Sequence, residues 1–255
     1  INGQFINYWF FNLGTNINGN GIDNSFLRGG PSFKSPGGYN YFLNLSSDNR
    51  KHFSFGGNHS QYWSFGNVDN NQNYGVFARY QPVNALRIFF RPGFSTRRST
   101  LQYLTTTKYL GENRYIFSSI RQQTVSATFR IDYTLSQDFT IQYYGSPFIS
   151  SGDYYDAKAI TNPKAENFID RYSSDVPLTN NTYETSYDFN FRQFRSNLVL
   201  RWEYRPGSLL YLVWNQGITD FENTGLFSIA DDFDSLFSQL PYNVFLIKFS
   251  YLLGN

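Results

Sequence analysis

The chain offers few residues that commonly carry catalysis. Its two histidines are His52 and His59, and on a strand they would lie on opposite faces, roughly 23 Å apart at strand rise. That separation is too large for a shared metal ion, and Ser60 would point away from His59, which argues against a Ser-His-acid hydrolase. The absence of cysteine excludes disulfides and thiolate metal sites. We therefore predict a protein that is not an enzyme, with no cofactor and no metal, whose histidines are ordinary rim or lumen side chains.

Charged residues could form ion pairs or bind a charged solute. Several of them occupy the polar positions of segments in which apolar and polar residues alternate. If these segments are strands, unlike charges on one face can meet across neighbouring strands. Two interpretations stay open: a network of ion pairs that fills a narrow barrel, or an arginine ladder that selects anions or sugars in a pore. The lumen-facing set comprises Arg79, Arg87, Arg91, Arg130, Asp132, Arg201, Glu203 and Lys248.

Acidic residues gather in two polar connections. Oxygen-rich loops can hold Ca²⁺, but no spacing here matches an EF-hand loop, and solvated surface acids are the simpler interpretation. A surface hydrolase would need two of these carboxylates in one cleft, about 5 to 9.5 Å apart. The two groups are Asp153, Asp156, Glu166, Asp170 and Asp175, then Asp220, Glu222, Asp231, Asp232 and Asp234.

Strict alternation indicates the strands that position these side chains. From Val125 to Tyr133 every second residue is apolar, and the residues between include Arg130 and Asp132. Leu86 to Phe94 alternates in a similar way. A strand of this kind has one apolar face and one polar face, the pattern of an outer-membrane barrel with lipid outside and a polar lumen inside.

Composition is consistent with that class. Aromatic residues make up 20% of the chain and charged residues only 16%, whereas soluble domains average about 25% charged residues. The mean hydropathy of -0.46 and the lack of a run of about 18 apolar residues exclude a helical membrane protein. A net charge of +2 gives no reason to expect nucleic acid as a partner, and Arg97-Arg98 is interpreted as a solvated rim.

The chain divides into about ten strands of a single antiparallel transmembrane β-barrel over residues 1–255. Alternation of short and long connections places all tight turns at one end, periplasmic in this class, and all long loops at the extracellular end. Short turns are expected near residues 47–51, 81–84, 135–138 and 205–207, and long loops at 17–38, 66–73, 107–114, 151–185 and 219–241.

Three local features follow from the pattern. Hairpins such as Ala85 to Tyr133 are longer than a membrane crossing requires and should project beyond it. The apolar parity changes between Phe191 and Leu198, which predicts a bulge near Gln193 to Arg195. In the last loop, Ser228 precedes a one-sided apolar spacing that predicts a capped helical turn, folded over the barrel mouth as a plug or lid.

The last strand alternates aromatic and aliphatic residues on one face. Phe245, Ile247, Phe249 and Tyr251 are similar to the signal that barrel-assembly machinery recognises in outer-membrane proteins, although the chain ends Leu-Leu-Gly-Asn rather than on Phe or Trp. We therefore expect this machinery as a partner during biogenesis.

A family resemblance adds to this interpretation. It rests on Leu200-Arg-Trp-Glu-Tyr-Arg-Pro-Gly-Ser-Leu-Leu-Tyr-Leu-Val-Trp214, Leu27-Arg-Gly-Gly-Pro31, Pro147-Phe-Ile-Ser-Ser-Gly-Asp153 and Asn243-Val-Phe-Leu-Ile-Lys-Phe-Ser-Tyr251. These segments resemble an uncharacterised family of bacterial outer-membrane proteins, in which a carbohydrate-binding family 9-like domain precedes a β-barrel of unknown function. The resemblance implies that an N-terminal domain, and with it some barrel strands, lies outside this sequence. It carries no established catalytic residues.

Three functions are expected in order. The first is a non-enzymatic anchor or narrow channel in the outer membrane of a Gram-negative bacterium, serving capture or passage of glycans or nutrients, with the sugar part resting on the resemblance alone. The second is an accessory subunit that binds other outer-membrane proteins or lipoproteins in a secretion or assembly complex. The third is the surface hydrolase. Outer-membrane lipid is a partner in the first two.

Overall fold

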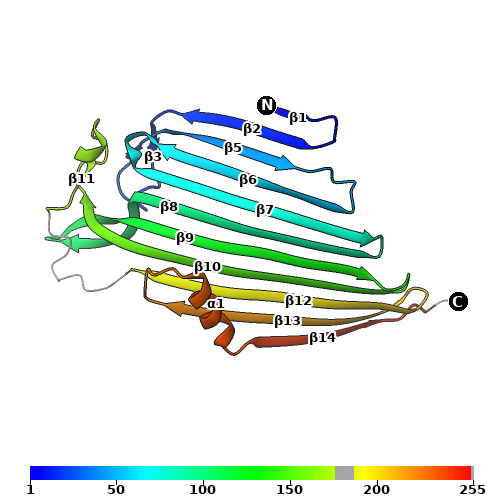
Figure 1. Cartoon of the computed structure of the whole chain (residues 1–255). Helices are drawn as coiled ribbons and strands as arrows, with labels where there is room; N and C mark the ends of the chain where they lie inside the picture. The colour runs from blue at the N-terminus through cyan, green and yellow to red at the C-terminus, as the bar shows by residue number, and fades with distance from the viewer. Residues whose placement is uncertain (176–186, 254–255) are drawn as a thin grey trace.

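The computed structural model describes residues 1–175 and 187–253, and it is all-β with antiparallel sheets (Figure 1). The main sheet runs in the order β1-β2-β5-β6-β7-β8-β9-β10-β12-β13-β14, with β11 paired to β10, while β3 and β4 form a separate hairpin. The strands are β1 (Asn2–Gln4), β2 (Phe10–Asn18), β3 (Gly21–Asp23), β4 (Phe33–Ser35), β5 (Gly38–Ser46), β6 (Phe53–Ser64), β7 (Asp69–Val83), β8 (Leu86–Tyr109), β9 (Glu112–Thr134), β10 (Phe139–Ile160), β11 (Tyr172–Ser173), β12 (Phe189–Arg205), β13 (Ser208–Glu222) and β14 (Tyr242–Ser250). The helices are η1 (Phe65–Asn67), η2 (Phe168–Arg171) and α1 (Ile229–Ser238).

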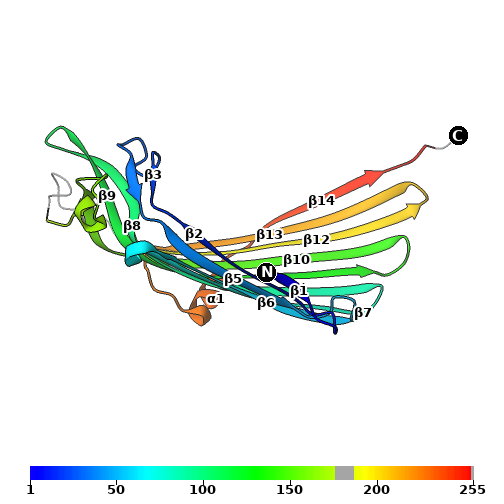
Figure 2. The same ribbon diagram turned by 90° about the horizontal axis from the view of Figure 1, so that it is seen from above.

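The main sheet is curved but open. Within the described residues β14 pairs with β13 alone, and β1 pairs with β2 alone, so that the two ends of the sheet do not meet (Figure 2). The expected closed barrel is therefore not found, and what is established is the antiparallel all-β sheet. Both terminal strands leave one row of backbone hydrogen-bonding groups unpaired.

The long strands agree with the expected number. Ten strands in the described part of the chain have nine or more residues, and β8, β9 and β10 have 24, 23 and 22. The β8–β9 hairpin extends beyond the other strands of the main sheet (Figure 1), and its projection beyond a membrane stays a prediction. Two expected long loops are wrong, because β8 and β9 meet at the tight turn Leu110–Gly111 and β7 begins at Asp69. The long connection expected from residue 151 begins later, after Ile160, where β10 ends. The strand residues in these segments are mostly polar on both faces. The alternation of apolar and polar residues that indicates a strand therefore ends before the strand itself does.

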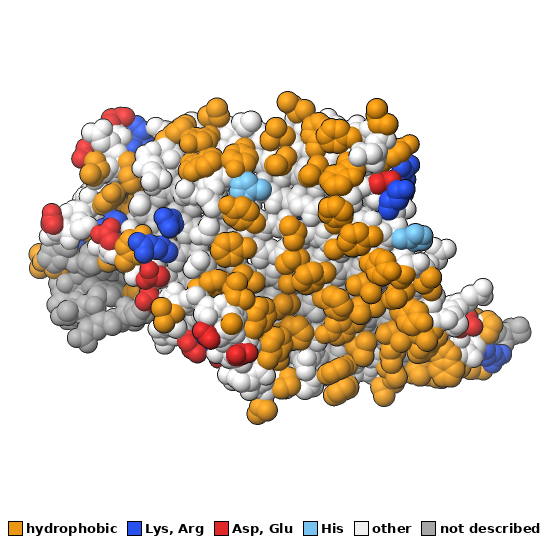
Figure 3. Space-filling model, in the orientation of Figure 1, with side chains coloured by type: hydrophobic (Ala, Val, Ile, Leu, Met, Phe, Trp, Pro, Cys, Tyr) orange, Lys and Arg blue, Asp and Glu red, His pale blue; other side chains and the backbone are white. Residues whose placement is uncertain are grey.

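The two faces of the sheet differ in chemistry. On the convex face the strand register aligns a row of Leu43, His59, Tyr74, Phe94, Val125 and Ile149, and a lower row of Leu86, Tyr133, Ile141, Leu200, Leu212 and Ile247. We call the region between these rows the apolar band. On β8 it runs from Leu86 to Phe94, about 27 Å along the strand at ~3.4 Å per residue. Figure 3 shows the hydrophobic side chains gathered on this face.

Successive side chains of β12 alternate between the two faces of the sheet throughout the pairing of this strand with β10. Its register with β10 is continuous from Phe189 to Trp202, so the predicted bulge near Gln193 to Arg195 is wrong. Phe189 and Phe191 instead face the concave side, and the convex positions at this end of β12 are taken by Asn190 and Arg192.

Helix α1 begins where the sequence predicted, after Ser228, but lies elsewhere. It contacts β12 and β13 and stands on the convex side of the sheet (Figures 1 and 2), so the predicted lid over the barrel mouth is wrong. Phe237 packs edge-on against Phe194, with ring centroids 5.4 Å apart. At its start Ser228 donates its backbone N–H to Asp232 and its hydroxyl to Asp231. In the described part of the chain no helix is long and apolar enough to cross a membrane.

A small core lies on the opposite side of the sheet, at the end that carries the long connections. Leu27, Phe33, Leu101 and Phe117 are almost completely buried, and Phe26 stacks between two of them. Arg171 is buried beside this core, and its guanidinium donates to the backbone carbonyl oxygens of Lys34, Ala165 and Glu166. The Arg171 contacts join η2 to the β3–β4 hairpin, and the core packs both against the long ends of β8 and β9.

Candidate functional site

The concave face carries all eight residues of the charged set that the sequence singled out. Arg87 lies opposite Asp132, Arg79 and Arg130 share a row through Phe89, and Arg201 shares a row with Lys248 through Tyr211. Along its strand, each of these residues alternates with the apolar residues that face the convex side. The alternation of the sequence therefore places these side chains, which come from β7, β8, β9, β12 and β14, on one surface.

Within the charged set, the ion pairs run along strands rather than across them. Arg130 Nη2 lies 3.0 Å from Asp132 Oδ1, and Arg201 Nη2 lies 3.0 Å from Glu203 Oε2. The expectation that unlike charges meet across neighbouring strands is wrong for both pairs. Side chains at positions i and i+2 of one strand share a face and are close enough for this shorter contact.

Arg87 and Arg91 differ from the rest of the set. Both are exposed on the concave face, and neither forms an ion pair with any described carboxylate within 4.0 Å. A guanidinium in this position can bind an anion or a hydroxyl-rich solute at the concave surface.

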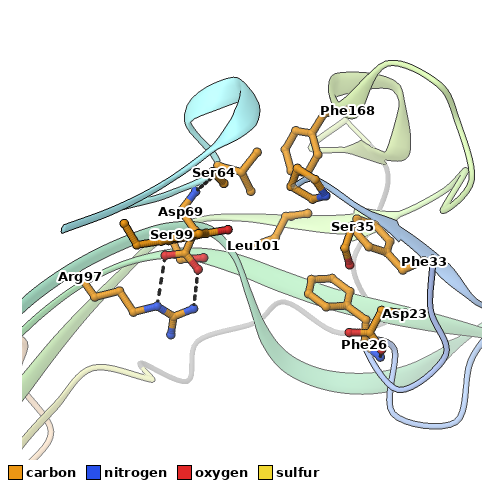
Figure 4. A pocket seen from close by; sticks show the side chains of 13 residues that line it. Asp23, Phe26, Phe33, Ser35, Ser64, Asp69, Arg97, Ser99, Leu101 and Phe168 are labelled. Carbon is orange, nitrogen blue, oxygen red and sulfur yellow. Dashed lines mark hydrogen bonds and ion pairs between the residues drawn. The ribbon is translucent and has the colours of Figure 1, made fainter. Parts of the chain in front are cut away.

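A pocket of about 190 Å³ lies at the loop end of the concave face (Figure 4). One wall is aromatic, made by Phe26, Phe33 and Phe168, and the other is polar. In the polar wall Asp69 from β7 and Arg97 from β8 form a bidentate pair, with Arg97 Nη2 2.9 Å from Asp69 Oδ2. Ser35, Ser64 and Ser99 add hydroxyl groups.

The electrostatics of this end are set by burial. Burial raises the pKa of the Tyr62 phenol, which lines the pocket, and the nearby Asp69 carboxylate raises it further. Burial also lowers the pKa of Arg171, partly offset by Glu166. The pocket therefore offers neutral hydroxyls, aromatic faces and one planar carboxylate–guanidinium pair. The sequence treated Arg97 as a rim residue and did not identify Asp69, because the distant β3–β4 and η2 segments complete the site.

The histidines lie apart, as expected, but His59 does not share the concave face with the charged set. It is on the convex face, where Tyr41 Oη lies 2.8 Å from His59 Nε2 and the ring stacks on Tyr74. His52 lies beyond the short turn after β5, and its Nδ1 is 2.7 Å from the carbonyl oxygen of Gln81. No group of three or more potential metal ligands occurs among the residues that the structure describes.

The acids of the expected loops have mixed positions. Asp153 and Asp156 are in β10, Asp220 and Glu222 are in β13, and Asp231, Asp232 and Asp234 are in α1, whereas Glu166, Asp170 and Asp175 lie in the connection after β10. Three of these acids converge on the almost completely buried Arg192 on the convex face. Asp232 Oδ1 lies 2.9 Å from Arg192 Nε, and Arg192 Nη1 contacts Asp220 and Glu222. The Asp232 contact holds α1 to the sheet, and all three carboxylates are engaged by Arg192.

The C-terminal strand has the alternation that the sequence suggested. Phe245, Ile247 and Phe249 pair with Trp214, Leu212 and Leu210 on the convex side, while Tyr251 follows the end of the strand. Phe245 and Ile247 are each 73% exposed because no strand covers the outer edge of β14 in the described structure. Strand β14 therefore exposes a row of large apolar side chains at one edge of the main sheet.

Comparison with known proteins identifies the family. A family model described as a domain of unknown function, DUF5916, matches residues 1–254. No curated protein and no solved structure gives a significant match to the chain. The match spans almost the whole chain, and the chain belongs to the DUF5916 family of uncharacterised domains.

Proposed function

We propose that this chain forms the wall of a transmembrane β-barrel in the outer membrane of a Gram-negative bacterium, as a non-enzymatic anchor or narrow channel. The observation that carries the proposal is the apolar band, because a convex face of this kind needs a solvent other than water. An apolar band about 25 Å tall over a polar interior is typical of such barrels. The large exposed apolar residues of the band would then contact hydrocarbon.

The open edges complete the proposal. Hydrocarbon provides no hydrogen-bond partners, so the outer edge of β14 must be paired when the sheet spans a membrane. Closure requires either the β1–β2 edge or further strands between the two edges. Additional strands would widen the lumen, and ten strands alone would leave it narrow.

The solute we propose is a glycan or a similar hydroxyl-rich molecule. Support comes from the pocket, where aromatic faces lie opposite the planar Asp69–Arg97 pair. Sugar rings pack their C–H faces on aromatic rings, and charged planar groups form strong hydrogen bonds with hydroxyls. The resemblance to proteins with a carbohydrate-binding family 9-like domain favours the same class.

Conductance in planar bilayers tests the channel. Protein inserted into the bilayer should give a current that added oligosaccharide reduces. A silent bilayer together with stable co-purification of another membrane protein would instead favour the accessory subunit, for which the uncovered edge of β14 is the supporting observation. Barrel-assembly machinery and lipid are the partners in either case.

Arg87→Ala with Arg91→Ala should shift the selectivity of the channel toward cations. Both guanidiniums are exposed on the concave face without a described acidic partner, so their removal takes positive charge directly from the lumen. The measurement is the reversal potential in a salt gradient. Arg98→Ala, on the opposite face of the same strand, is the matched control and should leave the reversal potential unchanged. Equal potentials for wild type and the double variant would eliminate these arginines as a filter.

A further inference from the structure

Two arginines lie side by side on the convex face, just beyond the apolar band. Above the row of Tyr74, Phe94 and Val125, the register continues through a row of Gln72, Thr96 and Gln123 to a row of Asn70, Arg98 and Arg121. Arg98 on β8 and Arg121 on β9 are direct partners in that register, and both side chains are exposed. Figure 3 shows basic side chains at this end of the convex face, next to the hydrophobic region.

The charge of this pair is not balanced by an ion pair. Like charges directly opposite each other on neighbouring strands destabilise a sheet. Within residues 1–175 and 187–253 neither arginine has a carboxylate within 4.0 Å, although Asp153 is the register partner of Arg121 on β10. The guanidinium of Arg121 instead lies 4.7 Å from the centre of the Tyr155 ring. An anion placed between the two arginines would remove the repulsion.

Space for such a group lies beside Arg98. One hollow of about 180 Å³ is lined by Asn70, Gln72, Thr96 and Arg98. A second, of about 220 Å³, is lined by Arg98, Asn67, Asn70 and Thr100, with Tyr155 from β10 and two further residues. The side-chain amides and hydroxyls of these linings supply hydrogen-bond donors to anionic oxygens.

We propose that Arg98 and Arg121 bind the phosphate of a lipid headgroup. This inference rests on the proposed function, since it places hydrocarbon on the apolar band. Arg98 is four positions beyond Phe94, about 13 Å along the tilted strand, which is the level where polar headgroups replace acyl chains. Guanidinium groups bind phosphate oxygens in bidentate fashion, and the polar linings receive the rest of the headgroup.

Binding of a water-soluble, short-chain phosphatidic acid to the full chain in neutral detergent tests the site. Arg98→Gln with Arg121→Gln should weaken binding by about tenfold or more, because charge-assisted hydrogen bonds to the phosphate are lost. The matched control is Lys51→Gln with Lys108→Gln, which removes the same charge from two exposed side chains, one in the β5–β6 turn and one near the tip of β8. It should change the dissociation constant by less than about twofold.

Two results would overturn the site. An equal loss in both double variants would mean general attraction to positive charge. Displacement of the lipid by inorganic phosphate at equal concentration would mean a free-phosphate site rather than a headgroup site. Because the probe is soluble, the binding assay is independent of membrane insertion. Failure of the proposed function is seen separately, as a folded and monodisperse chain in buffer without detergent.

Discussion

Arg192→Ala should lower the free energy of unfolding by about 3–5 kcal/mol, because it leaves the buried carboxylate of Asp232 without its charged partner. The side chains of Arg192 and Asp232 are 4% and 3% exposed, and Asn190 Nδ2 also donates to Asp232 over 2.7 Å. Loss of the arginine should release α1 from β12 and β13. Denaturant unfolding in detergent micelles measures the change.

A double-mutant cycle separates this effect from a general loss of packing. Asp232→Ala should destabilise the wild-type chain strongly, but should cost much less when Arg192 is already alanine. Asp234→Ala, an exposed acid on the same helix, is the control and should stay within about 0.5 kcal/mol of wild type. Additive effects of Arg192→Ala and Asp232→Ala would show that the pair does not attach the helix.

Phe90→Arg should reduce the stability of the chain folded in lipid vesicles by about 2–4 kcal/mol, the cost of arginine at the bilayer midplane on a lipid-facing strand. Phe90 is 45% exposed and lies midway along the apolar band on β8, opposite Phe129. Denaturant titration of the vesicle-bound protein measures the difference from wild type.

The control for Phe90→Arg lies on the other face of the same sheet. Ser126→Arg adds the same side chain on the concave side of β9, opposite Gly93. A polar lumen should accept it with a change of less than about 1 kcal/mol. Equal destabilisation by the two substitutions would show that the convex face is not in contact with hydrocarbon.

The sequence predicts the sheet well where one face is apolar. Along Val125 to Tyr133 the period of two separates the faces without ambiguity, and it places Arg130 and Asp132 on the concave side. Strand ends are predicted less well. Thr105, Thr106 and Thr107 continue β8 far beyond the apolar band, in a stretch where apolar and polar residues no longer alternate.

Tertiary contacts account for the other errors. The apolar spacing of α1 predicts its helix, but its place on the convex face depends on the contacts of Asp232 with the buried Arg192 and of Phe237 with Phe194. The pocket joins Asp69 and Arg97 to Phe33 and Phe168, which are far away in the chain. No local sequence pattern predicts this pocket, because its two walls come from segments that are distant in the chain and meet only when the connecting loops fold back onto the sheet. The barrel and its membrane remain predictions.

A spin-label scan of β9 tests the central claim that lipid covers the convex face. The chain has no cysteine, so single cysteine variants from Val125 to Tyr133 carry one label each in reconstituted vesicles. Accessibility to oxygen should be high and accessibility to a water-soluble nickel complex low at odd positions, with the reverse at even positions. Equal accessibility of both faces to the nickel complex would contradict the account.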